Sequence, residues 1–431
     1  MRDLVSQLSP LDRRRFIERL ARTTLGVALS PLLARQISAA PETPRASGGK
    51  AKRLIYLYLA GGLSHLDTFD LKPGHENQGD TRPINTTVAG AQIGQHLPTL
   101  ASQFDKLAVI RSLNTQTADH EAGEYLMRTS YKEIATERHP SLGPWIQQFK
   151  GRQSKSLPDT VLIGAPARHP GAGFFDPTFS PLPIGDPNRG LENITAPEYL
   201  TEASFEKRIK LIDGFDKKFR GRFPQRKVQA YTDFYSEAVS LLSSQELKAF
   251  NLNEEKGEDR DRYGRDPFGQ GCLLARRLIE NNVRCVEVTC GGWDMHSNIY
   301  NGAALPARAA VMDKAIGNLL KDLAERGLLG DTIVAVATEF GRSPKINYNA
   351  GRDHHPAVFS GVLAGGGVKG GQFYGASDAA GHGVDRDGVT PSDFNATIAT
   401  ALGLPLDQIV TSPTGRPFKV AQDGTAVSAL L

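Results

Sequence analysis

The chain has 431 residues, of which 39% are hydrophobic and 23% charged, and this length exceeds what one small core needs but is compatible with one large α/β domain that carries insertions. Residues 1–40 carry the whole net charge of +4, because they hold seven arginines and three acidic residues, so residues 41–431 are electrically neutral. This neutrality, together with the lack of a dense stripe of lysine and arginine, argues against a nucleic-acid-binding protein.

The first 40 residues have the pattern of a twin-arginine signal peptide. Asp12-Arg13-Arg14-Arg15-Phe16-Ile17 is followed by a weakly apolar stretch at 20–33 and by the small residues Ser38-Ala39-Ala40. The stretch is too short and too polar for a permanent membrane span, which needs about 20 apolar residues. We therefore expect a bacterial protein that the twin-arginine export machinery delivers to the periplasm or the exterior; a basic amphipathic helix that stays attached is the alternative.

A linker at 41–52 leads into alternating strand and helix patterns. Continuous apolar or β-prone runs predict strands at 54–59, 107–110, 283–289, 332–337 and 361–364. Helical patterns lie between them, most clearly at 268–280 and 307–325. This alternation predicts an α/β fold, a doubly wound and mostly parallel sheet with helices on both faces.

Two segments depart from this alternation. Residues 150–270 are first rich in proline and glycine and then charged and helical, which indicates an insertion, a cap or lid, within a domain at 53–431. The glycine-rich run at 365–371 lacks the spacing of a phosphate-binding loop and predicts a hairpin that leads into 372–375. The cysteines are odd in number and lack metal-type spacing, so we expect buried free thiols at Cys272, Cys285 and Cys290.

Histidine and acidic residues gather just after the predicted strands. In an open α/β sheet, ligands bind beyond the carboxyl ends of the strands, so these residues are the candidates for a site. Together with neighbouring arginines and a threonine, the candidates are Asp67 after the first strand; Arg111, Thr117 and His120 after the second; Asp294 and His296 after the third; and Glu339, Arg342, His354 and His355 after the fourth.

Carboxylates mixed with imidazoles suit zinc, manganese or iron and, with more oxygen ligands, magnesium or calcium. Asp294 and His296 are two residues apart, so they can share one face of an extended segment and converge on one ion, although an ordinary loop pair is the alternative. Glu339 ends a buried strand, where an ionised carboxylate needs a cation or strong hydrogen-bond donors, and Arg342 could serve that role without any metal. If His354 and His355 are extended, only one of them faces the site.

At these residues the chain resembles domain-of-unknown-function family 1501, a secreted bacterial group related to sulfatases and the wider alkaline phosphatase superfamily. The resemblance covers essentially the whole chain after the leader. The motifs that carry it are Gly61-Gly62-Leu63-Ser64-His65-Leu66-Asp67-Thr68-Phe69-Asp70, Arg111-Ser112-Leu113 with His120, Gly292-Trp293-Asp294-Met295-His296-Ser297-Asn298, and Glu339-Phe340-Gly341-Arg342-Ser343-Pro344 leading to Gly351-Arg352-Asp353-His354-His355.

The resemblance implies an alkaline phosphatase-like fold in which two metal ions clamp a phosphate or sulfate ester while a serine, threonine or modified cysteine attacks. By position, Asp67 resembles a metal ligand that ends the first strand, and Asp294 with His296 resembles an Asp/His ligand pair. The chain departs from the pattern in three ways. Glu339-Phe340 stands where an Asp-His pair is usual, the spacing from Asp294 to His296 is tighter than the usual Asp-x3-His, and the modified-residue motif of sulfatases is missing.

These observations lead to one hypothesis and one rival. The hypothesis is an exported metal-dependent hydrolase of phosphate or sulfate esters, acting on a small molecule or a glycan. Asp67, Asp294, His296, Glu339 and His354 or His355 would be ligands, Arg111 or Arg342 would neutralise developing charge, and His120 or Thr117 would attack or assist. The rival is a non-catalytic relative that keeps the fold as a binding or scaffold protein.

Overall fold

The computed structural model describes residues 49–431 except 155, 165–167, 192–201, 223–240 and 242–243. The predicted twin-arginine segment at 1–40 and most of the linker therefore lie outside the described residues. Residues 44–431 form one structural unit, which is built around a single large sheet.

The sheet has eight strands in the order β12-β4-β11-β8-β1-β7-β5-β6. Seven of them run parallel, and only β11 is antiparallel to its neighbours β4 and β8. This confirms the predicted mostly parallel α/β sheet. The strands span β1 Arg53–Leu59, β4 Leu107–Leu113, β5 Thr160–Ile163, β6 Leu182–Ile184, β7 Cys285–Cys290, β8 Thr332–Ala337, β11 Phe359–Gly365 and β12 Gln372–Tyr374.

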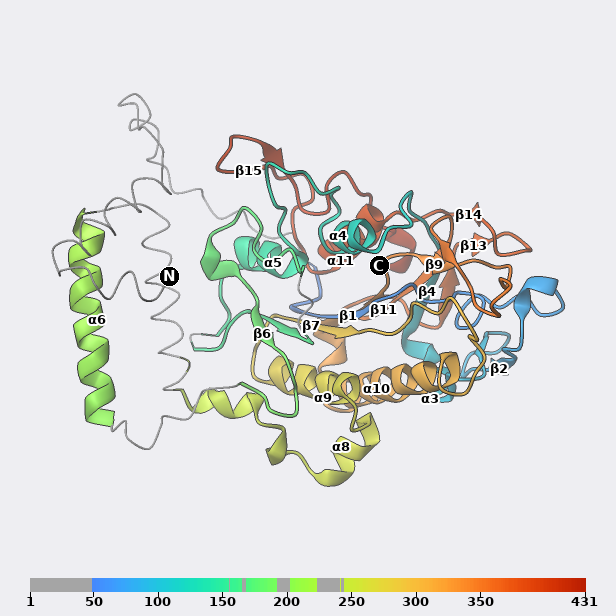
Figure 1. Cartoon of the computed structure of the whole chain (residues 1–431), viewed down its shortest axis with the longest axis horizontal. Coiled ribbons are helices and arrows are strands. Elements are labelled where there is room, and N and C mark those ends of the chain that lie inside the picture. Colours follow the sequence, from blue (N-terminus) through green and yellow to red (C-terminus); the bar gives the residue numbers. More distant parts are fainter. Residues whose placement is uncertain (1–48, 155, 165–167, 192–201, 223–240, 242–243) are drawn as a thin grey trace, which may run out of the picture. The chain divides into compact units, whose positions relative to one another are not determined.

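Helices cover both faces of the sheet (Figure 1). Successive residues of β1 point to opposite faces: Ile55 and Leu57 belong to the core under one layer of helices, whereas Tyr56 and Tyr58 belong to the core under the other. A strand that must fill two cores is apolar at nearly every position, which explains the continuous run in the sequence. One layer contains α3 Pro98–Ser102, α9 Pro267–Glu280 and α10 Leu305–Glu325, and the other contains α4 His120–Thr129, α5 Leu142–Lys150 and α11 Pro391–Ala401.

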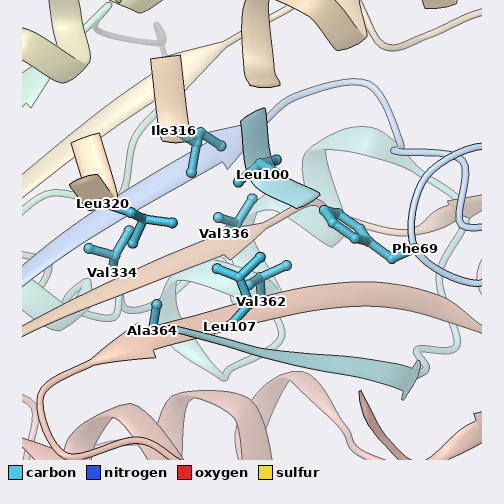
Figure 2. A pocket seen from close by; sticks show the side chains of 9 residues that line it. All are labelled: Phe69, Leu100, Leu107, Ile316, Leu320, Val334, Val336, Val362 and Ala364. Carbon is cyan, nitrogen blue, oxygen red and sulfur yellow. The ribbon is translucent and has the colours of Figure 1, made fainter. Parts of the chain in front are cut away.

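The packing between the sheet and α10 is close but leaves a small apolar cavity (Figure 2). Its volume is about 10 Å³, and Leu320 and Ile316 of α10 face Val334 and Val336 of β8 across it. The other lining side chains are apolar as well, so a water molecule would find no hydrogen-bond partner there. The cavity is therefore a packing defect of the core and not a ligand site.

The glycine-rich run does not form the predicted hairpin. β12 pairs parallel to β4, on the side of β4 away from β11, so residues 366–371 cross to the far side of β4 instead of turning back along β11. The prediction was wrong because glycine indicates a turn but does not indicate the strand with which the next segment pairs.

The three cysteines are buried free thiols, as predicted.

Residues 150–270 contribute β5 and the edge strand β6 to the sheet, and α8 Gly257–Tyr263 packs near α9 and α10. The prediction that this region forms a cap or lid stays a prediction.

No helix among the described residues is long and apolar enough to cross a membrane. The remaining helices and strands are α6 Glu202–Arg222 and the short strands β2 Pro83–Asn85, β3 Gln92–Gly94, β9 Gly341–Arg342, β10 His354–His355, β13 Ala376–Ser377, β14 Val384–Arg386, β15 Val410–Thr411 and β16 Pro417–Phe418.

Candidate metal centre

The direction of the strands brings the candidate residues to one edge of the sheet. The parallel strands β1, β4, β7 and β8 all end at this edge, and their carboxyl ends are followed by 60–62, 114–120, 291–296 and 338–342. β11 is antiparallel, so it begins at the same edge and the residues before it, β10, also lie there. Segments far apart in the sequence therefore meet at one place.

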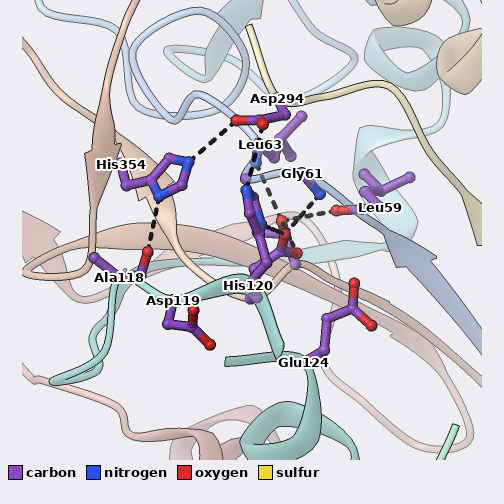
Figure 3. Close-up of polar contacts among 12 residues, drawn as sticks. Leu59, Gly61, Leu63, Ala118, Asp119, His120, Glu124, Asp294 and His354 are labelled. Atoms are coloured by element: carbon purple, nitrogen blue, oxygen red, sulfur yellow. Dashed lines mark hydrogen bonds and ion pairs between the residues drawn. The ribbon is translucent and has the colours of Figure 1, made fainter. Parts of the chain in front are cut away.

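Three side chains at this edge form a group that could hold a metal ion (Figure 3). One ligand atom from each of His120, Asp294 and His354 lies within 4.8 Å of the other two. His354 Nε2 is 3.1 Å from Asp294 Oδ1, and His120 Nε2 is 3.5 Å from Asp294 Oδ2. His120 comes from the first turn of α4, Asp294 from the loop after β7, and His354 from β10.

Asp294 and His296 lie on one face of their segment, as their spacing predicts. Trp293 and Met295 are buried, whereas Asp294 and His296 are exposed, because alternate residues of extended chain point to opposite sides. His296 Nε2 is 2.9 Å from Asp294 Oδ1 and 3.0 Å from His354 Nε2. His296 thus extends the group of three on its solvent side.

Each of the three imidazoles has an oxygen acceptor at Nδ1. The acceptors are Glu339 Oε1 for His120 at 2.6 Å, the Ala118 carbonyl for His354 at 2.7 Å and Asp353 Oδ1 for His296 at 3.1 Å. A neutral imidazole that donates from Nδ1 presents a lone pair at Nε2. Three such lone pairs and a carboxylate then lie close together. Arg342 donates to Asp294, and its Nη1 is 3.3 Å from His296 Nε2, which leaves the Nε2 lone pairs of His120 and His354 for a cation. The donor set therefore fits a metal ion.

His120 is the most constrained of these candidate ligands. Its Nε2 is buried and has no hydrogen-bond partner, and its ring lies 4.9 Å from the ring of Phe340. The hydrogen bond from Nδ1 to Glu339 raises the pKa of His120, against the opposing effect of burial. A buried polar atom without a hydrogen-bond partner calls for an explanation, and service as a metal ligand would supply one.

Arg342 holds Asp294 in place. Its guanidinium is buried and donates to the Asp294 carboxylate and to the carbonyl oxygens of Gly61, Gly62 and Arg352. Burial tends to raise the pKa of Asp294, but the hydrogen bond and charge of Arg342 outweigh it and lower that pKa to about 2. Asp294 is therefore ionised at neutral pH and available as a ligand.

Asp67 lies apart from this group and is already paired with a cation. Its Oδ2 accepts from Arg352 Nε at 2.8 Å and from Ser64 Oγ at 2.5 Å, and its Oδ1 accepts from Tyr300 and Thr81. Both Asp67 and Arg352 are fully buried. The guanidinium thus places a positive charge at Asp67, and the ligand role that the resemblance implies for Asp67 stays a prediction.

The remaining candidates have other contacts. His355 Nε2 is 2.8 Å from the carbonyl oxygen of His382, so the structure brings His354 and not His355 into the group of three. Arg111 lies 3.6 Å from Asp70 and stacks over Phe373. Thr117 Oγ1 accepts a hydrogen bond from the backbone N–H of Asp119. The roles expected of these three residues stay predictions.

Sequence reasoning missed the residues that support the candidate ligands. Tyr58 alternates with apolar residues in β1, and this pattern predicts only a core residue. Its hydroxyl nevertheless donates to Glu339 Oε2 at 3.0 Å. Arg352 belongs to one of the family motifs, but an arginine between glycine and aspartate gives no sign that it pairs with the buried Asp67, 285 residues earlier. The acceptor of His354 is a backbone carbonyl, which no side-chain pattern can reveal.

A family profile described as "Protein of unknown function (DUF1501)" matches residues 51–431. The chain belongs to this family. The resemblance inferred from the sequence motifs is thereby confirmed. Among curated proteins, none matches this DUF1501 chain by sequence.

Solved structures of the alkaline phosphatase superfamily are similar to this DUF1501 protein. A superfamily protein from Vibrio parahaemolyticus has a TM-score of 0.42 at 10% identity over 92% of this chain and 76% of its own. The lipoteichoic acid synthase LtaP from Listeria monocytogenes gives 0.38 at 11% over 90% and 79%, and alkaline phosphatase from the Antarctic bacterium TAB5 gives 0.36 at 14% over 84% and 100%. Identities this low transfer no substrate and no residue role.

Proposed function

We propose that this DUF1501 protein is a metal-dependent hydrolase of phosphate or sulfate esters, with its metal ion held by His120, Asp294 and His354. The observation that carries the proposal is the convergence of two Nε2 lone pairs on the Asp294 carboxylate, with His296 beside them. The twin-arginine machinery would export the folded chain to the periplasm or beyond, where a small-molecule or glycan ester would be the substrate.

The donor set favours a transition metal. Two imidazole nitrogens and one carboxylate oxygen suit zinc, iron or manganese, whereas magnesium and calcium take mainly oxygen ligands. Such an ion, when bound, polarises an ester oxygen and activates a nucleophile at neutral pH. Three protein ligands leave room for a substrate, as in catalytic and not in structural zinc sites.

The surrounding residues suit an anionic ester. α4 begins at His120, so the partial positive charge of its N-terminus lies at the site and favours a phosphate or sulfate group. Arg342 fixes the Asp294 carboxylate from behind. His296 is the most exposed imidazole of the cluster, with 45% of its side chain accessible, and it is the group best placed to pass a proton to the leaving oxygen.

The test is metal content combined with turnover. We expect plasma mass spectrometry to find about one equivalent of zinc, iron or manganese in the washed wild-type protein. Asp294→Asn should lose the metal and reduce hydrolysis of 4-nitrophenyl phosphate and 4-nitrophenyl sulfate to background while its circular dichroism stays unchanged. Asp407→Asn, which changes an exposed carboxylate outside the site, is the control and should behave as wild type. Full turnover by Asp294→Asn would contradict the proposal.

The second candidate is a non-catalytic binding or scaffold protein that keeps one metal ion. The placement of Asp67 favours it, because this carboxylate is paired with Arg352 and is not free for a second ion. A chain that retains stoichiometric metal but hydrolyses neither ester would support this candidate. A chain with no metal, and no rescue by added ions, would contradict both.

A further inference from the structure

Glu339 is a fully buried carboxylate directly behind the candidate metal centre. It follows Thr338 at the end of β8, and burying it without partners would cost several kcal/mol. Its oxygens accept hydrogen bonds from the Gly61 N–H at 2.7 Å, from Tyr58 at 3.0 Å and from Thr338 at 3.3 Å. These donors come from β1, from the loop after it and from the end of β8. They fix the position of the carboxylate independently of its contact with His120.

The fourth contact of Glu339 is with His120. Its Oε1 lies 2.6 Å from His120 Nδ1, while Nε2 of the same ring faces Asp294 Oδ2 at 3.5 Å. Glu339 therefore contacts the nitrogen that points away from the carboxylate of the metal group. An ionised carboxylate can only accept, so Nδ1 carries the hydrogen and Nε2 the lone pair.

We propose that Glu339 is a positioning residue that holds His120 in the orientation and tautomer in which Nε2 binds the metal ion. This inference rests on the proposed metal centre and gives Glu339 a role different from that of the ligand expected from the sequence. A carboxylate that accepts from the far nitrogen of a ligating histidine fixes the ring and makes it a more basic ligand.

Two substitutions at Glu339 separate the two roles. Glu339→Gln keeps an acceptor for Nδ1 but removes the charge, and we expect it to weaken zinc binding about tenfold; Glu339→Leu removes the acceptor and should weaken binding about 100-fold. Zinc alone is the probe, titrated against a competing chelator into the metal-free protein. If Glu339 is instead a direct ligand, both variants lose the ion to the same extent, and the proposal is overturned.

Tyr58 offers a variant with a matched control in the same strand. Tyr58→Phe removes one donor to Glu339 and should weaken zinc binding by less than Glu339→Gln does. Tyr56 is also buried in β1, stacked near Tyr58 with ring centroids 6.5 Å apart, but its hydroxyl donates to the carbonyl of Met127. Tyr56→Phe should bind zinc as wild type does, and equal losses in both variants would contradict the proposal.

Nitrogen-15 NMR of the metal-free protein tests the proposal without metal. In wild type at pH 8 the signals of His120, assigned with His120→Gln, should show hydrogen on Nδ1; in Glu339→Leu they should shift towards the Nε2–H form. If wild type binds no zinc, the proposed function fails, yet the NMR result still reports whether Glu339 sets the tautomer. A His120 tautomer that is the same in wild type and Glu339→Leu overturns the proposal.

Discussion

Gly123 faces Glu339 from the second turn of α4, and a Cβ atom there would lie 2.9 Å from the Cβ of Glu339. This approach is closer than side-chain carbons tolerate, so the distance between α4 and the end of β8 depends on the missing side chain. Because His120 begins the same helix, Gly123 also sets how near His120 lies to Glu339. The sequence shows only a glycine in a helix. By itself this glycine predicts a less stable helix and not a close contact with Glu339.

Gly123→Ala should destabilise the protein, because overpacking a core costs about 1–3 kcal/mol and alanine gains at most about 1 kcal/mol over glycine in a helix. Among the described residues, no atom lies within 4 Å of a Cβ added at Gly214 of α6, so Gly214→Ala is the control and should be neutral or stabilising. Urea unfolding measures both. A Gly123→Ala protein as stable as the control would show that α4 can shift away from Glu339.

At the scale of elements, the single antiparallel strand decides which residues enter the site. β11 reverses direction between β8 and β4, and this reversal brings His354 to the edge where β7 and β8 end. The apolar run at 361–364 predicts a strand but carries no sign of its direction, because direction is set by the neighbouring strands. The group of three could therefore not be selected from the sequence: Asp294 and His354 were among the six candidate ligands, whereas His120 was expected to attack or assist.

Helix α10 anchors the opposite face of the sheet through Leu320, which lines the apolar cavity of Figure 2. Leu320→Ala would enlarge that cavity and should lower the free energy of unfolding by about 2–5 kcal/mol. Leu320→Met nearly conserves volume and should cost less than about 1.5 kcal/mol. Thermal unfolding compares the two, and zinc binding should be the same in both because the cavity lies on the other layer from α4. Equal stability of the two variants would mean that the cavity collapses when Leu320 is shortened.

At the scale of the whole molecule, a buried ion pair joins α4 to the sheet. Arg128 Nε donates to Glu287 Oε1 of β7 at 2.7 Å, and His169 Nε2 is 2.9 Å from Glu287 Oε2. Arg128 also stacks over the ring of Tyr58, the donor to Glu339. Burial would raise the pKa of Glu287, but Arg128 and His169 outweigh it and lower that pKa to about 2.

A lowered folded-state pKa gives a definite dependence of stability on pH. The contribution of Glu287 is complete above about pH 4.3, its unfolded value, and is lost as the pH falls towards 2. Glu287→Gln should cost about 3–5 kcal/mol at pH 7, and this difference from wild type should shrink between pH 4.3 and pH 2. Urea unfolding at several pH values measures it, and a difference that does not change with pH would contradict the assigned pKa.

The sequence by itself determined five of the eight strands of the large sheet, the family and the chemistry available at the sheet edge, because apolar periodicity and motif residues are local properties. It also placed Asp294 and His296 on one face, since their spacing of two fixes this in extended chain. The tertiary structure alone decided that His354 and not His355 joins Asp294, that Arg352 neutralises Asp67, and that Glu339 lies behind His120. Each of these depends on strand order and direction, which bring together residues separated by up to 285 positions, and no local pattern records such contacts.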